Sequence, residues 1–134
     1  MWLREESADL VLEDFRMMPP VDNRDGLIIV DVQNDFCPGG ALPVQDCDSV
    51  VTTLNRWIEC ASQTGAKVVA SRDWHPPDHA SFQEHGGKWP KHCVRETTGA
   101  QFRPDLSLPP DVFVVSKGTQ ADRDSYSAFA ETGL

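Results

Sequence analysis

The hydrophobic pattern predicts three buried strands and one amphipathic helix. Apolar runs at Leu27–Val30, Lys67–Ser71 and Val112–Ser116 lack the alternation of a half-exposed strand. Such runs are typical of strands buried on both faces of a parallel sheet. Residues 48–64 carry apolar side chains at the three- and four-residue spacing of one helical stripe: Val51, Leu54, Ile58 and Ala61. The order strand, helix, strand predicts a βαβ unit and hence an α/β domain.

The chain divides into an acidic N-terminal extension and one domain. Residues 1–20 have scattered apolar positions and predict a short helix that ends at Pro19-Pro20. Residues 21–134 predict a three-layer αβα domain with a mostly parallel sheet. Strands buried on both faces need helices on both sides, and the pattern offers one convincing helix. We therefore expect residues 21–134 to be the N-terminal portion of such a domain, with its C-terminal part missing.

Composition and charge exclude several classes of partner. The 134 residues carry 12 basic and 21 acidic side chains, for a formal net charge of -9. This excess of acid argues against nucleic acid and against anionic membrane surfaces. No apolar run approaches the roughly 20 residues of a membrane helix. The first residues lack the apolar core of a secretory peptide, so we expect a cytoplasmic protein.

The four cysteines are expected to be thiols. Four are too few for a disulfide scaffold in a chain of this length, and their spacings match no zinc ribbon. This expectation covers Cys37, Cys47, Cys60 and Cys93.

The densest candidate chemistry lies just after the second predicted strand. Asp73, His75 and His79 fall within seven positions, and His92 follows downstream. Histidines and a carboxylate, with coordination sites left to water, suit a divalent metal ion such as Zn, Fe or Mn. Pro76-Pro77 stiffens the loop between the histidines. The alternative is a solvated polar loop in which each histidine only forms hydrogen bonds.

Charged side chains also follow the other strands. Asp31, Asp73 and Lys117 each stand at or just beyond the carboxyl end of a predicted strand. Ligands of open α/β sheets bind outside this edge. Individually, a strand-end aspartate is more often a turn former or helix cap, and a strand-end lysine is usually solvated. Their coincidence favours one shared site. The span from Pro76 to Pro110 shows no strong periodicity, and such long loops are usually functional.

From Leu27 to about Phe129 the sequence resembles the nicotinamidase/pyrazinamidase branch of the isochorismatase-like cysteine hydrolases. Several separated motifs in the same order carry the resemblance: Ile28–Cys37, Arg72–His75, His79–Phe82, Trp89–Val94, Ser116–Thr119 and Asp124–Phe129. The resemblance implies a Rossmann-like αβα fold. It also implies hydrolysis of nicotinamide to nicotinate and ammonia in NAD salvage, with nicotinamide or a related amide as the small-molecule substrate. A homo-oligomer is compatible with this assignment.

The resemblance also implies roles for individual residues. Asp31 would be the general base that takes the proton of a cysteine thiol, and Lys117 would stabilise both the thiolate and this carboxylate. A metal ion held by Asp73, His75, His79 and His92 would bind the pyridine nitrogen. Aromatic side chains would flank the ring or line its pocket: Phe36, Trp89 and Tyr126. On pattern alone, ordinary core aromatics are the favoured interpretation of Phe36 and Trp89, and a plain surface residue is the alternative for Tyr126.

The sequence departs from this family in one respect. The family's nucleophile lies in a motif of the type Ala-Thr-Asp-Tyr-Cys-Val after a further strand, and none of the four cysteines stands in that context. Cys37 and Cys93 lie in the expected pocket loops, but these positions are not the family's nucleophile. Two alternatives to the nicotinamidase hypothesis therefore remain. The first is a non-catalytic metal-binding fragment, and the second is another cysteine hydrolase of the same superfamily.

Overall fold

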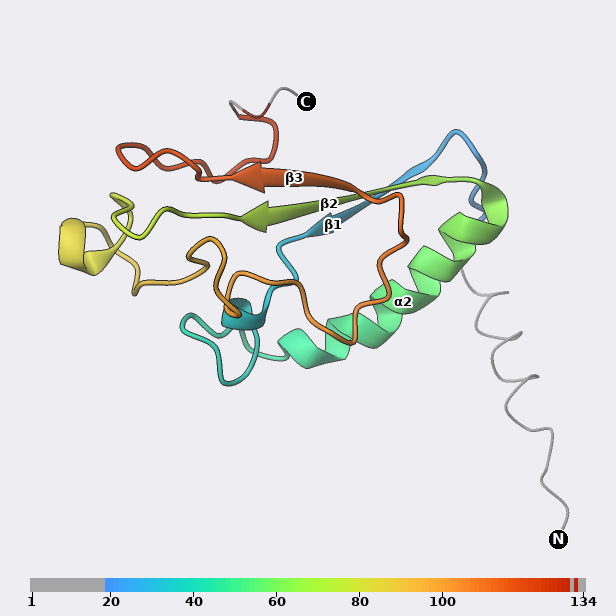
Figure 1. The fold of residues 1–134 in the computed structure, drawn as a ribbon. Helices are drawn as coiled ribbons and strands as arrows, with labels where there is room; N and C mark the ends of the chain where they lie inside the picture. The colour runs from blue at the N-terminus through green and yellow to red at the C-terminus, as the bar shows by residue number, and fades with distance from the viewer. Residues whose placement is uncertain (1–18, 131, 133–134) are drawn as a thin grey trace, which may run out of the picture.

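A parallel three-stranded sheet forms the centre of the fold (Figure 1). The computed structural model describes residues 19–130 and residue 132, so the predicted N-terminal helix lies outside the described residues. Strands β1 (Gly26–Val30), β2 (Lys67–Asp73) and β3 (Phe113–Lys117) pair in the order β1-β2-β3. The three predicted strands are confirmed, with β2 running two residues further than expected. All three point the same way, so their carboxyl ends meet at one edge.

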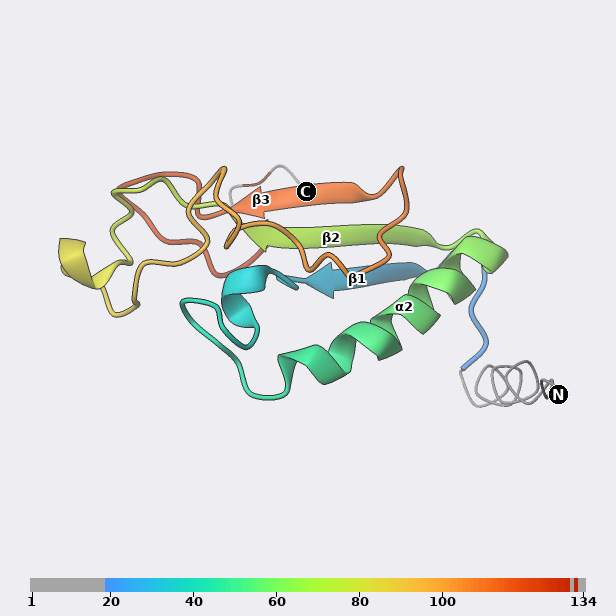
Figure 2. The same cartoon turned by 60° about the horizontal axis from the view of Figure 1, so that its bottom comes forward.

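Helix α2 (Cys47–Thr64) covers one face of this sheet (Figure 2). The predicted helix is thereby confirmed, and Gly65 takes the left-handed conformation after its end, with φ 78°. Asp46 occupies the N-cap position but makes no side-chain cap. The buried core lies between helix and sheet: Ile29, Val32, Val51, Ile58, Ala70 and Leu106. No helix within the described residues is both long and apolar enough to cross a membrane.

Within the described residues the second face of the sheet has no helical cover, as the single predicted helix leads us to expect. Ile28, Val30 and Phe113 point to this face and are 52%, 64% and 58% exposed. The α/β class with a parallel sheet is confirmed, but the part of the chain that the structure describes contains one helical layer rather than two. Apolar runs indicate strands that can be buried on both faces, and they do not show which residues supply the cover.

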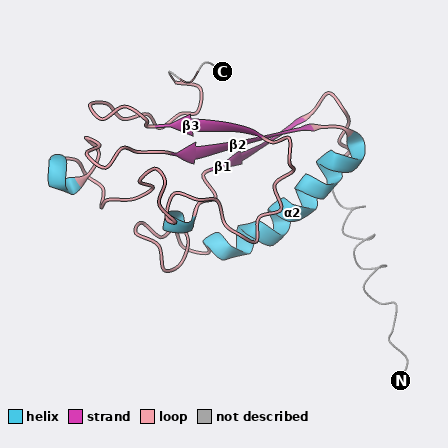
Figure 3. Ribbon diagram, in the orientation of Figure 1, coloured by secondary structure: helices cyan, strands magenta, loops and turns pink. Residues whose placement is uncertain are grey.

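The long span after β2 divides into two parts. Its first part, with the short 3-10 helix η2 (Gln83–His85), gathers beside the carboxyl ends of the strands, as does 3-10 helix η1 (Asn34–Phe36) (Figure 3). Its second part packs against the core through Phe102, Leu106 and Leu108. The side chain of Asn55 on α2 hydrogen-bonds the backbone of this part at residues 105 and 107, with both distances 2.8 Å. Only the first part is therefore placed to act at a site.

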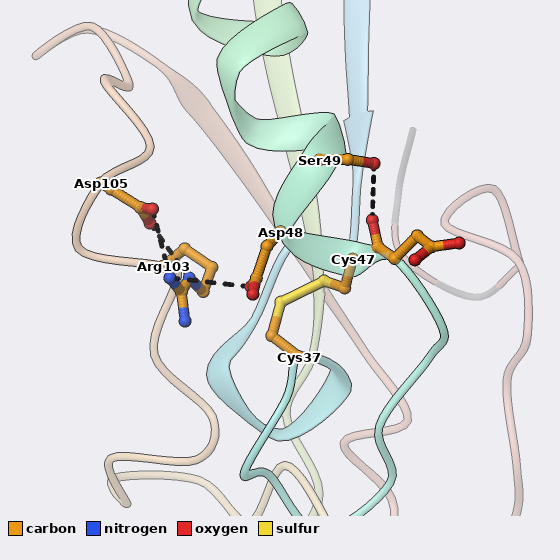
Figure 4. The surroundings of a disulfide bond; sticks show 7 residues. Cys37, Cys47, Asp48, Ser49, Arg103 and Asp105 are labelled. Carbon is orange, nitrogen blue, oxygen red and sulfur yellow. Dashed lines mark hydrogen bonds and ion pairs between the residues drawn. A yellow bond between two sulfur atoms is a disulfide. The ribbon is translucent and has the colours of Figure 1, made fainter.

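A disulfide joins Cys37 to Cys47, which corrects the expectation that these two residues are thiols (Figure 4). The loop between them folds back on the residues that precede it, because Val44 N–H donates to the carbonyl of Phe36 at 2.8 Å. This return brings the two cysteine Cα atoms to 5.2 Å, within the range for a disulfide. Spacing along the chain cannot show such a return. Cys60 and Cys93 are free thiols, as expected, and both are buried.

Cys47→Ser is expected to lower the free energy of unfolding by about 2–3 kcal/mol, because an uncrosslinked unfolded chain regains the entropy of a loop of this length. Urea unfolding of the oxidised protein measures the loss. A disulfide-specific reductant provides the control, since it should destabilise the natural chain by the same amount and leave Cys47→Ser unchanged. If the protein isolated from its native cells already contains four titratable thiols, the bond does not form there.

Candidate active site

Three charged side chains meet at the carboxyl edge of the sheet. β2 and β3 pair in a register that sets Asp73 opposite Lys117. The Lys117 ammonium lies between two carboxylates, 2.8 Å from Asp31 Oδ2 and in contact with Asp73 Oδ1. Ser71 Oγ donates a hydrogen bond of 2.7 Å to the other oxygen of Asp31. The structure thus brings together the strand-end residues that the sequence predicts to share a site.

Burial and charge act in opposite directions on this group. Burial alone would raise the pKa of Asp73, but the neighbouring His75, His92 and Lys117 outweigh it and hold that pKa well below its usual range. Burial alone would lower the pKa of Lys117, but Asp73 and Asp31 outweigh it and raise the pKa. At neutral pH, Asp73 is therefore an anion and Lys117 a cation, and each stabilises the charge of the other.

Asp73 also belongs to a group of metal-type ligands. One ligand atom each of Asp73, His75 and His92 lies within 4.8 Å of the others, and all three residues are buried. Asp73 Oδ2 is 3.4 Å from His75 Nε2 and 3.7 Å from His92 Nε2. One carboxylate and two imidazoles form a donor set that suits a divalent transition metal.

Backbone carbonyls orient both imidazoles of this group. His75 Nδ1 lies 2.8 Å from the carbonyl of Gly118, and His92 Nδ1 lies 2.7 Å from that of Pro90. Because a carbonyl only accepts, each Nδ1 carries a proton. Each Nε2 faces Asp73, where it donates to the carboxylate when it carries a proton and can bind a metal ion when it does not. Gly118 has φ 60°, and a Cβ there would lie 2.4 Å from His75 Cε1, so this support requires glycine.

His79 differs from the sequence prediction. Its ring is fully buried and stacks on His75 at 4.1 Å between centroids. However, its Nδ1 lies 2.7 Å from Ser81 Oγ and its Nε2 lies 3.0 Å from the carbonyl of Arg123. The structure therefore places His79 beside the ligand group but with both nitrogens engaged elsewhere. Its role as a ligand stays a prediction.

The charged group opens into a pocket of about 320 Å³, the size of a small-molecule site. Phe36, Trp89 and Tyr126 line it, as the resemblance implies, and Trp89 Nε1 donates a hydrogen bond of 3.1 Å to the Tyr126 hydroxyl. The same pocket is lined by five residues of the two groups above: Asp31, Asp73, His75, His92 and Lys117. Polar chemistry and an aromatic enclosure thus share one cavity.

Part of the pocket wall was not apparent from the sequence. Leu42, Pro43 and Val44 form an apolar wall that the disulfide-closed loop supplies. In the sequence, the spacing of Cys37 and Cys47 points to this wall only when the two residues are known to form a disulfide. Cys93 lies nearby, but its burial, followed by the negative charge of Asp73, raises the pKa of its thiol. A thiol kept protonated in this way is a poor nucleophile.

Fold and site together define an α/β domain with metal-type ligands and a small-molecule pocket at the carboxyl edge of a parallel sheet. The model of the isochorismatase domain matches residues 25–134. The chain therefore belongs to the isochorismatase family.

Individual relatives are consistent with this membership. The chain is 42% identical to the nicotinamidase of Escherichia coli over 131 residues, which cover 87% of this chain and 60% of the relative. The solved pyrazinamidase of Pyrococcus horikoshii in complex with zinc is 48% identical, with a TM-score of 0.78, covering 81% of this chain and 60% of that one. The structure of PnC1 from L. infantum in complex with nicotinate is 39% identical, with a TM-score of 0.74, covering 84% and 57%. The chain thus spans about three fifths of the length of these relatives.

Proposed function

We propose that this chain carries most of the active site of a nicotinamidase-type amide hydrolase, which converts nicotinamide to nicotinate and ammonia. The observation that carries the proposal is the shared pocket. Its floor holds the Asp31–Lys117 pair beside Asp73, His75 and His92, and its walls are aromatic and apolar. The relatives that bind nicotinate or zinc in solved structures support the same assignment.

Asp31 is the general base of the proposed reaction. Lys117 and the Ser71 hydroxyl each hold one of its oxygens, so the carboxylate is fixed at the pocket floor. There it can accept the proton of a cysteine thiol whose thiolate attacks the carboxamide carbon, and ammonia then leaves. Water releases nicotinate from the resulting thioester. The thiol belongs to the family motif that these 134 residues do not contain.

The metal ion of the proposed site is zinc. Asp73, His75 and His92 would hold it, with His79 as a further ligand if its ring turns from its present partners. When bound, the ion supplies a Lewis acid for the pyridine nitrogen, which positions the ring and leaves the amide free. Phe36 and Trp89 enclose the ring, and Tyr126 holds Trp89 in place. Cytoplasmic location and self-association stay predictions.

The test begins with the gene beyond the codon for Leu134. A continuation with the cysteine motif provides the protein to assay, and it should release ammonia from nicotinamide. Asp31→Asn should lower kcat by about 10²–10⁴-fold, because it removes the proton acceptor while keeping the shape of the side chain. Unchanged turnover in that variant would refute the assigned role.

A binding measurement on the 134-residue chain completes this test. The zinc-loaded chain should bind nicotinamide in a calorimetric titration, and Phe36→Ala should weaken the binding. Binding without ammonia release would identify a non-catalytic fragment. A complete enzyme that ignores nicotinamide but hydrolyses another amide would place the protein elsewhere in the superfamily.

A further inference from the structure

Gln33 supports Asp73 at the end of β2, where no residue of β1 pairs with the backbone N–H and carbonyl of Asp73. β1 ends at Val30, and the last bond from this side runs from Asp31 N–H to the carbonyl of Ser71 at 3.1 Å. Beyond it, the amide of Gln33 takes the place of a strand. Its Oε1 accepts from Asp73 N–H and its Nε2 donates to the Asp73 carbonyl, both at 2.8 Å. One side chain therefore satisfies both backbone groups of a metal-type ligand.

The position of Gln33 leaves this amide no freedom. The side chain is fully buried, and its Nε2 also donates to the carbonyl of Ala100 at 2.8 Å. Neither end can turn without leaving a buried polar group unpaired, which destabilises the folded chain. The backbone of Asp73 is thus held from one side by Gln33 and from the other by its pairing with Lys117.

Asp35 holds the segment that carries His92. Its Oδ2 accepts a hydrogen bond of 2.7 Å from the backbone N–H of Cys93, the residue directly after His92. Cys93 has φ 45°, an unfavourable conformation for a residue with a side chain, so this bend needs external support. The carboxylate fits tightly, because a Cβ on Gly99 would lie 2.2 Å from its Oδ2. Its other oxygen accepts from Ala41 N–H at 3.2 Å.

Gln33 and Asp35 therefore link two ligands that lie on separate segments, Asp73 at the end of β2 and His92 on a loop. The same connection reaches the third ligand, because His75 N–H donates to the carbonyl of Cys93 at 3.0 Å. We propose that Gln33 and Asp35 are positioning residues of the metal centre, which set the distance between Asp73 and His92. The inference rests on the metal centre of the proposed function. Groups that orient metal ligands in this way commonly change metal affinity by 10–100-fold.

The experiment compares zinc affinity among three variants of the 134-residue chain. Gln33→Met keeps the length of the side chain and removes its three hydrogen bonds, and Asp35→Asn keeps the shape and removes one acceptor. Asn34→Leu is the matched control, because the side chain of Asn34 donates at 2.8 Å to the carbonyl of Thr98, a residue that is not one of the metal-type ligands. Competition with a chromophoric chelator should show zinc binding weakened about 10–100-fold in the first two and less than about threefold in the control.

Two further readouts separate positioning from simple destabilisation. The visible spectrum of bound Co²⁺ reports ligand geometry, and it should change in Gln33→Met and Asp35→Asn but not in Asn34→Leu. Urea unfolding of the metal-free variants measures the structural cost on its own. Lower stability with unchanged zinc affinity and an unchanged cobalt spectrum would overturn the proposal. If Gln33→Met does not fold, Asp35→Asn decides.

These measurements do not depend on turnover. Weakened zinc binding in the variants, together with a complete enzyme that fails to hydrolyse nicotinamide, would refute the proposed function and leave this inference standing. Normal zinc affinity in the variants, together with nicotinamide hydrolysis by the complete enzyme, would support the proposed function and refute this inference. A natural chain that does not bind zinc would overturn both the metal centre and its supports.

Discussion

Lys117→Met is expected to lower the free energy of unfolding of the metal-free chain by about 3–5 kcal/mol. The loss arises because the carboxylates of Asp31 and Asp73 then lack the cation that compensates their charges. Lys117 is 5% exposed and is the cation in contact with both Asp31 and Asp73. Its removal leaves two carboxylates facing each other at the edge of the sheet. Methionine fills a similar volume, so the loss of packing is small. Urea unfolding at neutral pH measures the effect.

A second lysine provides the control. Lys91 pairs with Glu84 at 2.6 Å, but the two side chains are 44% and 50% exposed. Exposed ion pairs contribute at most about 1 kcal/mol, so Lys91→Met should change stability little. Adding Asp31→Asn to Lys117→Met should recover part of the loss, because one of the two stranded charges is removed. Equal losses in the two lysine variants would show that the Lys117 group is not a buried charge cluster.

The framework of this site can be predicted from the sequence, because the framework depends on apolar runs that recur along the chain. Apolar runs locate three strands, and parallel strands necessarily bring their carboxyl ends to one edge. Asp31, Asp73 and Lys117 could therefore be expected to meet. The aromatic residues Phe36 and Trp89 come from the resemblance, and their presence in the pocket agrees with it.

The supports of the site could not be predicted in this way. Gln33 acts across 40 positions and Asp35 across 58, through bonds to backbone atoms that any residue type possesses. Such bonds leave no pattern of partner side chains in the sequence. The Cys37–Cys47 bond similarly depends on how its loop folds back. The histidine spacing correctly indicates a cluster, but side-chain rotation decides which rings face Asp73, and His79 faces Arg123 instead.

Zinc is expected to stabilise the chain by about 2.7 kcal/mol at a free concentration of 100 times its dissociation constant, because it binds only the folded state. His75→Ala and His92→Ala each remove one of three ligands. If affinity falls 100-fold, the same zinc concentration stabilises by only about 0.4 kcal/mol. Thermal or urea unfolding with and without zinc measures this difference, and each variant is compared with its own metal-free state. His85→Ala is the control, since His85 is exposed and its ring pairs with the exposed carboxylate of Glu84.

His79→Ala distinguishes two versions of the metal centre. In the structure, both nitrogens of His79 are engaged by Ser81 and Arg123, so the variant should lose stability with and without zinc to a similar extent. The zinc-dependent part should then stay close to that of the natural chain. A zinc-dependent loss as large as that of His92→Ala would show that the ring turns to the ion and that His79 is a fourth ligand. Undiminished zinc stabilisation in His75→Ala and His92→Ala would instead place the ion outside this group altogether.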